Sequence, residues 1–239
     1  SERELLEKVR KVAEENIRIL EEVLRKIAEV VKEDLKLLKE LLEATERVVE
    51  ELLKRIVEKK KREPEEAIRR LRKLLKELRE EMERVKKESK RLLEELERIL
   101  RRAKEKTEEL LKRLRELLEA GLPRKDLAET LLRVVEAHAK LLRDVARVLL
   151  KLLEDHIRLS RELARRTEEV LKRIAKILRE ESEDETLERL LEELERLVKE
   201  VVERSERLLK KLLEDVRRVA EELVKSVEDL LKDIEREVT

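Results

Sequence analysis

The chain contains two histidines, and both lie on an apolar face. They occur in the stretch VEAHAKLLRDVARVLLKLLEDHIRLS, residues 135–160, where His138 and His156 have the spacing i, i+18. This spacing corresponds to five full helical turns, so both side chains project from the same side of a helix. An imidazole in such a place can ligate a metal, transfer protons or hold a hydrogen bond inside a core.

One acidic residue also lies on an apolar face. Asp34 follows Asn16 at the same i, i+18 spacing and so repeats its position on the helix. Asp34, His156 and either Ser160 or Ser89 supply the residue types of a serine hydrolase triad. Residue types alone are weak support, because a closed helical bundle offers neither a cleft nor an oxyanion hole. We therefore predict no catalytic residue and no enzymatic activity.

Metal and haem sites are the other chemistry that these histidines allow. A histidine on the core face of a four-helix bundle can ligate haem iron, so a porphyrin bound through His138 or His156 is one alternative. The two histidines are five helical turns apart, however, so each height along the helix offers only one histidine for a haem iron. Bulky neighbours such as Leu131 and Leu149 also leave no flat cavity for a porphyrin. A di-metal site needs Glu-x-x-His, whereas Glu154 is two positions from His156 and off its face. We predict no metal site and no cofactor.

The composition excludes several classes of function. The chain has 239 residues, of which 63 are basic and 62 acidic, and the two signs are interleaved. A nucleic-acid surface needs a basic patch or stacking aromatics, and this chain has neither. Cysteine is absent, which excludes disulfides and thiolate metal sites. No apolar run is long enough to span a membrane, so we expect a soluble protein with no membrane and no nucleic-acid partner.

Helix breakers divide the chain into four helices. Pro64 fits the first turn of a helix and follows a basic run that suits a helix C-terminus. Gly121 fits a left-handed C-terminal cap, Pro123 restarts a helix, and Ser182 or Asp184 can cap the last one. Short turns between matched helices predict an all-α, antiparallel, up-down-up-down four-helix bundle forming a single domain, residues 1–239. The predicted helices span residues 2–61, 64–120, 123–181 and 185–237.

The apolar positions repeat at i, i+18, which predicts a nearly straight bundle, since a heptad repeat would impose a left-handed supercoil. The first and third helices carry wider apolar stripes than the other two. The wide stripes fit helices on the short diagonal of a rhombic cross-section, or alternatively an exposed flank for self-association. Examples of the repeat are Leu5, Val23 and Leu41 in the first helix and Ala128, Ala146 and Ala164 in the third.

Most uncharged polar side chains fall on the apolar stripes and at shared levels. Residues that face each other across a tight antiparallel turn have a nearly constant sum of residue numbers, and this rule sorts the polar residues into three layers. We interpret these layers as buried hydrogen-bond networks that specify register, because an unpaired buried polar group costs about 1–3 kcal/mol. The first layer holds Asn16, Thr107, His138 and Ser226; the second holds Asp34, Ser89, His156, Ser160 and Ser205; the third holds Thr45 and Thr167.

The layers also suggest a response to pH. A buried neutral histidine is disrupted by protonation, so the first layer should weaken on acidification. In the second layer we expect His156 to donate to Asp34. A charged His156 could then be stabilised there, which leaves the sign of the response open.

The whole chain resembles computationally designed helical bundles with buried hydrogen-bond networks. The resemblance rests on the Leu/Glu/Lys/Arg filling, turns such as REPEEA and EAGLPRKDL, the lack of aromatics, and the polar layers. One departure is that such networks often use more Asn and Gln, whereas this chain has one Asn and no Gln. The start at Ser1 fits a trimmed recombinant chain.

The resemblance implies a structural scaffold that has no natural substrate and no natural cellular location. It implies no required partner. A homo-oligomer or a designed helical partner bound through the wide stripes of the first and third helices remains the alternative.

Overall fold

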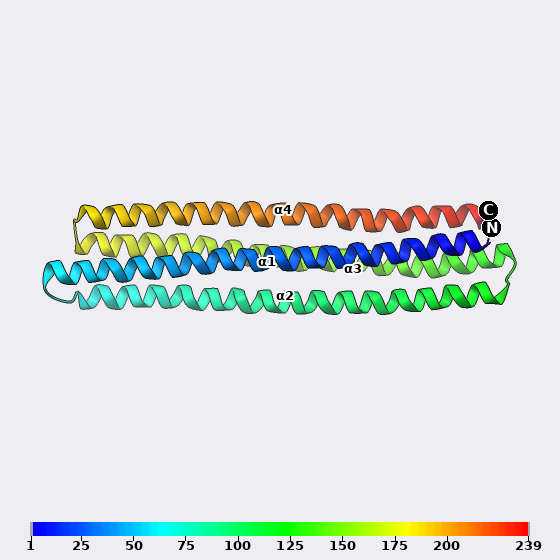
Figure 1. Ribbon diagram of the computed structural model, residues 1–239, viewed down its shortest axis with the longest axis horizontal. Coiled ribbons are helices and arrows are strands. Elements are labelled where there is room, and N and C mark those ends of the chain that lie inside the picture. Colours follow the sequence, from blue (N-terminus) through cyan, green and yellow to red (C-terminus); the bar gives the residue numbers. More distant parts are fainter. Residues whose placement is uncertain (1, 239) are drawn as a thin grey trace. The chain divides into compact units, whose positions relative to one another are not determined.

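The computed structural model describes residues 2–238 and confirms the all-α prediction. Four helices account for nearly all of these residues (Figure 1), and the described part of the chain contains no strand. Each helix boundary lies within one residue of its predicted position. The helices are α1 (Glu2–Lys60), α2 (Glu65–Ala120), α3 (Arg124–Glu181) and α4 (Glu185–Val238).

The turns explain these boundaries. Lys61 and Gly121 end α1 and α2 with positive φ angles of 54° and 59°, the left-handed conformation that terminates helices. The carbonyls of Pro64 and Pro123 accept the first hydrogen bonds of α2 and α3, each at 2.9 Å, so both helices begin one residue after the proline. At the third turn the cap is Asp184, whose Oδ1 accepts the Thr186 backbone N–H at 3.1 Å.

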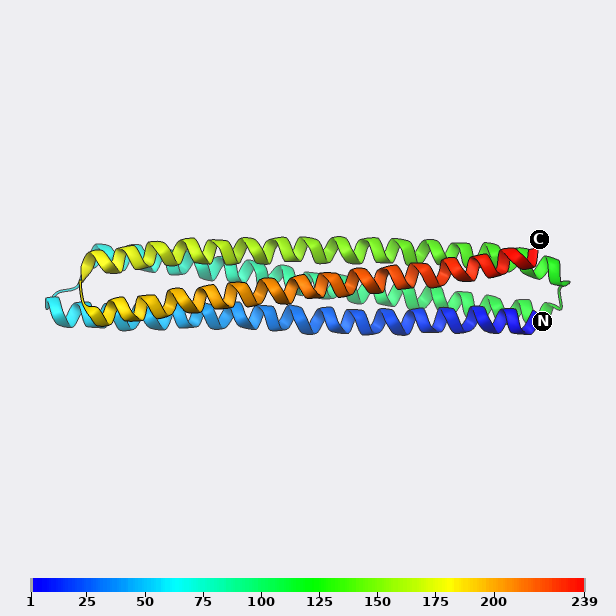
Figure 2. The same ribbon diagram turned by 90° about the horizontal axis from the view of Figure 1, so that it is seen from above.

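The packed chain divides into two compact units, and every helix contributes a segment to each. Among the described residues, unit 1 comprises 2–29, 92–154 and 212–238, and unit 2 comprises 30–91 and 155–211. Within each unit the chain direction alternates from one helix to the next, as the up-down-up-down prediction requires (Figure 1). Unit 1 holds the α2–α3 turn, beside which α1 begins and α4 ends (Figure 2). Unit 2 holds the other two turns.

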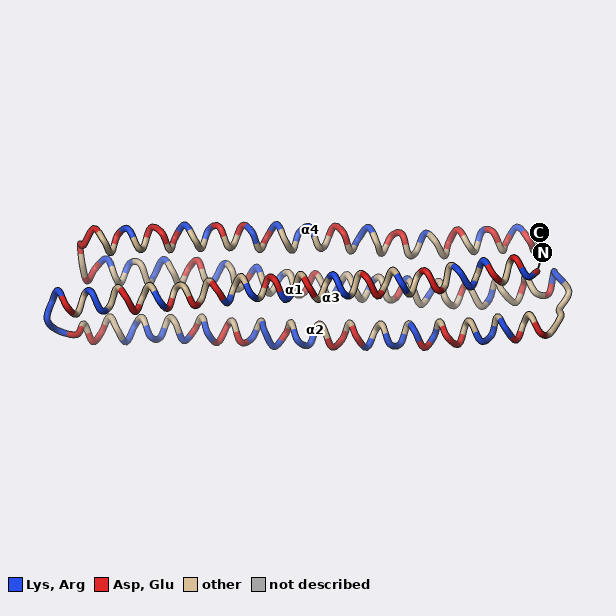
Figure 3. The backbone as a smooth tube through the Cα atoms, viewed as in Figure 1, with Lys and Arg blue, Asp and Glu red and all other residues tan. Residues whose placement is uncertain are grey.

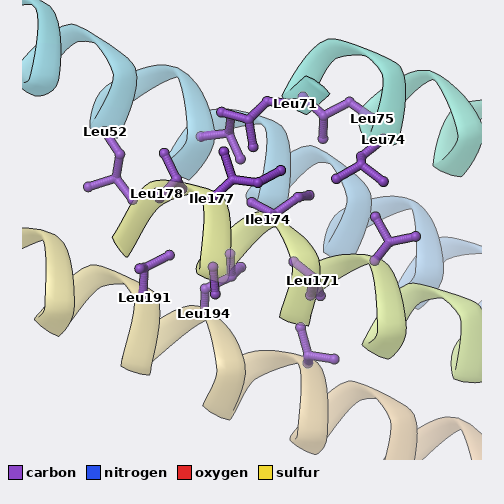
Figure 4. Close-up of a cluster of buried hydrophobic side chains, with 14 of the residues drawn as sticks. Leu52, Leu71, Leu74, Leu75, Leu171, Ile174, Ile177, Leu178, Leu191 and Leu194 are labelled. Carbon is purple, nitrogen blue, oxygen red and sulfur yellow. The ribbon is translucent and has the colours of Figure 1, made fainter. Parts of the chain in front are cut away.

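Aliphatic side chains from all four helices fill the core of each unit. In unit 2, Leu52, Leu71, Ile174 and Leu191 are at most 1% exposed and belong to one cluster (Figure 4). Burying one such side chain contributes about 1.5–3 kcal/mol. The corresponding cluster in unit 1 draws on Val9, Leu114, Leu131 and Ile234.

The wide apolar stripes of α1 and α3 pack within the chain. On α1, the flanking residues Val12 and Val48 are half-buried against the cores of unit 1 and unit 2, respectively. Within residues 2–238, three large apolar side chains are exposed, and they lie on three different helices: Leu118, Val148 and Leu197, at 43%, 38% and 36%. These scattered residues do not make the stripes of α1 and α3 a continuous exposed face.

Basic and acidic residues are interleaved along all four helices (Figure 3). In unit 1, Lys8 pairs with Asp233, and Lys26 pairs with Asp215 at 2.5 Å. Lys26 lies 18 residues after Lys8 on α1, and Asp215 lies 18 residues before Asp233 on α4. The same interval on the two antiparallel helices therefore brings a second oppositely charged pair together. Exposed pairs contribute only about 0.2–1 kcal/mol each, so the register needs other determinants as well. No described helix has a stretch apolar enough to cross a membrane.

Candidate functional site: two buried polar layers

The polar residues singled out in the sequence lie almost entirely inside the protein. Ser226 is half-buried, at the edge of its stripe. The remaining ten are at most 7% exposed: Asn16, Asp34, Thr45, Ser89, Thr107, His138, His156, Ser160, Thr167 and Ser205. We call Asp34, Ser89, His156, Ser160 and Ser205 in unit 2 the aspartate layer, and Asn16, Thr107, His138 and Ser226 in unit 1 the asparagine layer.

Asp34 is the centre of the aspartate layer. Its side chain is fully buried, and two serine hydroxyls bind its carboxylate. Ser160 on α3 donates to Oδ2 at 2.7 Å, and Ser205 on α4 donates to Oδ1. Burial raises the pKa of Asp34 above its ordinary value, and the two hydroxyl hydrogen bonds oppose that rise without cancelling it. One carboxylate therefore joins three helices of unit 2.

His156 does not donate to Asp34, which corrects the expectation from the sequence. Its Nδ1 lies 3.5 Å from the Ser89 Oγ, a long contact, and its Nε2 is enclosed without a partner. Burial lowers the pKa of His156 to about 4, so the ring is neutral at pH 7 and supplies no charge to the carboxylate. Ser160, one turn further along α3, reaches Asp34 instead.

The asparagine layer is less completely hydrogen-bonded. Ser226 on α4 donates to the Asn16 Oδ1 at 2.9 Å, and its hydroxyl also lies 3.0 Å from the Leu223 carbonyl oxygen on its own helix. Three enclosed atoms have no partner: Asn16 Nδ2, Thr107 Oγ1 and His138 Nε2. Burial lowers the pKa of His138 to about 4, so this ring is also neutral at pH 7.

The three side chains that carry these unpartnered atoms lie near a common level of unit 1. An ion pair between Lys104 and Glu21, at 2.9 Å, aligns α2 with α1 and sets Thr107 beside the turn that carries Asn16. Thr107 nevertheless makes no hydrogen bond to Asn16 or His138, although the sequence predicted that it faces both.

The two threonines of the predicted third layer bond to their own helices. Thr45 donates to the Leu41 carbonyl and Thr167 to the Leu163 carbonyl, both at 2.8 Å. No hydrogen bond joins the two hydroxyls, which corrects the prediction of a network between α1 and α3. Their burial costs little, because each donor is satisfied one turn back along its own backbone.

A groove in unit 1 reaches the asparagine layer, and sequence reasoning missed it. It lies between α2 and α3, has a volume of about 330 Å³, and includes His138 in its lining. Ala137 also lines the groove and is exposed. A small side chain next to a histidine leaves open space beside the ring, and this was the signal in the sequence that could have predicted the groove. Among the described residues, no three His, Cys, Asp or Glu side chains cluster as metal ligands would.

Comparisons with known proteins assign no family. No family model, curated protein or solved structure matches the chain.

Proposed function

We propose that the protein is a structural scaffold of the designed helical-bundle type, without catalytic activity, whose buried polar layers specify helix register. The observation that carries this proposal is the Asp34 carboxylate, bound by Ser160 from α3 and Ser205 from α4. A slip of either partner helix would remove a hydroxyl from a fully buried carboxyl group, and the correct register would then be favoured over the slipped one.

Energetics favour specificity over stability as the role of Asp34. Moving a carboxylate into a protein interior costs several kcal/mol even after relaxation. Two hydrogen bonds to a charged group return about 1.5–3 kcal/mol each. These terms nearly cancel, so the aspartate layer adds little net stability in the native register. In a slipped register the desolvation cost of the carboxylate remains, but its two hydrogen bonds are lost.

The same contacts argue against hydrolysis. Ser89 and His156 are the only serine and histidine in the layer that approach each other, and both are buried. Ser160 and Ser205 donate to Asp34 rather than to a histidine, and all three side chains are buried away from any substrate.

A designed origin is supported by the regularity of the chain. The i, i+18 repeats, the three minimal turns and the restricted alphabet agree with one another, as they do in idealised bundles. The inward polar residues are the main interruption of that regularity.

The triple variant Asp34→Leu, Ser160→Ala, Ser205→Ala tests the register role. It replaces the network by apolar groups, so we expect a free energy of unfolding equal to or above that of the wild type. We also expect loss of a single register, seen as doubled amide signals in ¹H–¹⁵N spectra. A single sharp set of signals with reduced stability would show that the layer serves stability and would contradict the proposal.

The alternative of an assembly module is tested by the absolute mass in solution. Light scattering with refractive-index detection suits a chain without Trp or Tyr. One chain per particle supports the scaffold, and two or more chains would assign the apolar stripes of α1 and α3 to an interface.

A further inference from the structure

We propose that the groove between α2 and α3 of unit 1 binds small uncharged phenols, with the His138 imidazole as the polar anchor. The inference is independent of the register role of Asp34, because it concerns a surface beside the asparagine layer that the aspartate layer does not share.

The lining of the groove matches an apolar ring. Leu110 from α2 and Val134, Ala137 and Leu141 from α3 supply aliphatic surface around a volume of about 330 Å³. A benzene ring with one substituent fits such a volume with room to spare. Ala137 is the exposed member of this lining, so the apolar surface is open to a ligand from outside.

His138 supplies unused hydrogen-bonding capacity at the base of the groove. The residue is 5% exposed, and no described residue hydrogen-bonds to the ring. Its Nε2 is enclosed, so Nδ1 is the ring nitrogen left for a ligand in the groove. A neutral imidazole has one nitrogen that accepts and one that donates. A phenol hydroxyl can donate to Nδ1 when the enclosed Nε2 carries the ring proton, and the bond would satisfy an acceptor for which the protein supplies no donor.

Charged side chains at the rim of the groove favour an aromatic ligand. Lys106, Glu109 and Arg113 line it, and all three are exposed. Either cation can lie over the face of an aromatic ring, which is favourable for a cation–π contact. A benzene ring with a single hydroxyl combines the three features: an apolar body, one donor and an electron-rich face.

The two-histidine composition gives a direct test by nuclear magnetic resonance. The protein is labelled with ¹³C and ¹⁵N at histidine and titrated with phenol at pH 7. We expect the His138 ring signals to shift and saturate in the millimolar range, as suits a ligand of so few atoms. The His156 signals should stay unchanged, because that ring lies in unit 2. Equal shifts at both histidines, or none at His138, would overturn the proposal.

Anisole tests the role of the hydroxyl. It has the same ring but no O–H donor, so we expect at least tenfold weaker binding than for phenol. Equal affinity for the two would assign the groove to apolar contact alone and refute the histidine anchor.

A matched pair of variants tests the location. Ala137→Leu fills the groove from an exposed helix position, and we expect it to abolish the His138 shift. Glu136→Leu adds the same side chain at the neighbouring exposed position, which does not line the groove, and should leave binding intact. Circular dichroism verifies that both variants fold. Binding retained in Ala137→Leu would place the phenol elsewhere and refute the site.

Discussion

The aspartate layer and the asparagine layer solve the burial of polar groups in opposite ways. In unit 2 a carboxyl group is fully buried and both of its oxygens accept hydrogen bonds from residues of two other helices. In unit 1 every group is neutral, one interhelical hydrogen bond is made, and three enclosed atoms remain unpartnered. The more costly group has the more complete set of partners.

This difference follows from what each group loses without water. An unpaired buried carboxylate costs several kcal/mol, whereas an unpaired neutral hydroxyl or amide costs about 1–3 kcal/mol. Each neutral defect is therefore less costly than one charged defect. Loss of a hydrogen-bond partner should therefore lower the free energy of unfolding more in the aspartate layer than in the asparagine layer.

The largest expected effect comes from removing the partners of Asp34. The double variant Ser160→Ala, Ser205→Ala leaves the carboxylate buried without donors. We expect it to lower the free energy of unfolding at pH 7 by about 3–5 kcal/mol. Guanidinium unfolding followed by circular dichroism measures the loss.

The asparagine layer supplies the control for that experiment. Ser226→Ala removes its single interhelical hydrogen bond, to a neutral partner, and should cost about 1 kcal/mol. Equal losses in the double variant and in Ser226→Ala would mean that the carboxylate is not the more demanding group, and the comparison would fail.

Acid gives the next largest effect, through the two histidines. Burial lowers the pKa of each from 6.5 to about 4, so the unfolded chain takes up a proton before the native protein does. Stability is therefore full above pH 6.5 and falls as the pH drops toward 4, by about 3 kcal/mol per histidine at ~1.4 kcal/mol per pKa unit. Because His156 makes no hydrogen bond to Asp34, both histidines respond with the same sign.

The pH dependence that Asp34 gives to stability is opposite in sign to that of the two histidines. Its pKa is raised in the native state, so the native protein binds a proton first. Its contribution to stability is largest at low pH and is lost as the pH rises through its native pKa. Acid should thus weaken unit 1 through His138 without relief, while Asp34 offsets part of the loss that His156 causes in unit 2.

Single variants separate these contributions. Unfolding free energies at pH 7 and pH 4 are compared for the wild type, His138→Leu and Asp34→Asn. We expect His138→Leu to remove about 3 kcal/mol of the acid-induced loss, and Asp34→Asn to enlarge the loss. The exposed carboxylates are common to all three proteins and cancel in the comparison. An acid-induced loss in His138→Leu as large as in the wild type would show that this ring does not titrate as its burial requires.

The sequence predicted the helices well because each boundary depends on local chemistry. Pro64, Gly121 and Pro123 act through their own backbone preferences, so their effect does not depend on how the helices pack. The burial of Asp34 and His138 likewise follows from a five-turn apolar repeat that is read along one helix.

The hydrogen-bond partners could not be predicted in the same way. Matching levels across a turn is uncertain by one or two positions, or about 1.5–3 Å along the axis. A hydrogen bond tolerates only a few tenths of an ångström around a donor–acceptor distance of about 2.9 Å. This uncertainty covers both His156, which the sequence predicted as the donor to Asp34, and Ser160, which makes the bond in the structure. For Thr45, the nearby backbone carbonyl competed with any interhelical partner, a choice that the residue type alone does not decide.

The smallest expected effect compares two buried threonines that satisfy their hydroxyls differently. Thr107 has an enclosed hydroxyl without a partner, while Thr45 donates to the Leu41 carbonyl at 2.8 Å. Valine has nearly the same shape without the hydroxyl. Thr107→Val should therefore raise the free energy of unfolding by about 1 kcal/mol, and Thr45→Val should leave it unchanged or lower it by less than about 1 kcal/mol. Stabilisation by both substitutions would show that the local bond of Thr45 does not compensate its burial, and equal losses would show that the Thr107 hydroxyl finds a partner in solution.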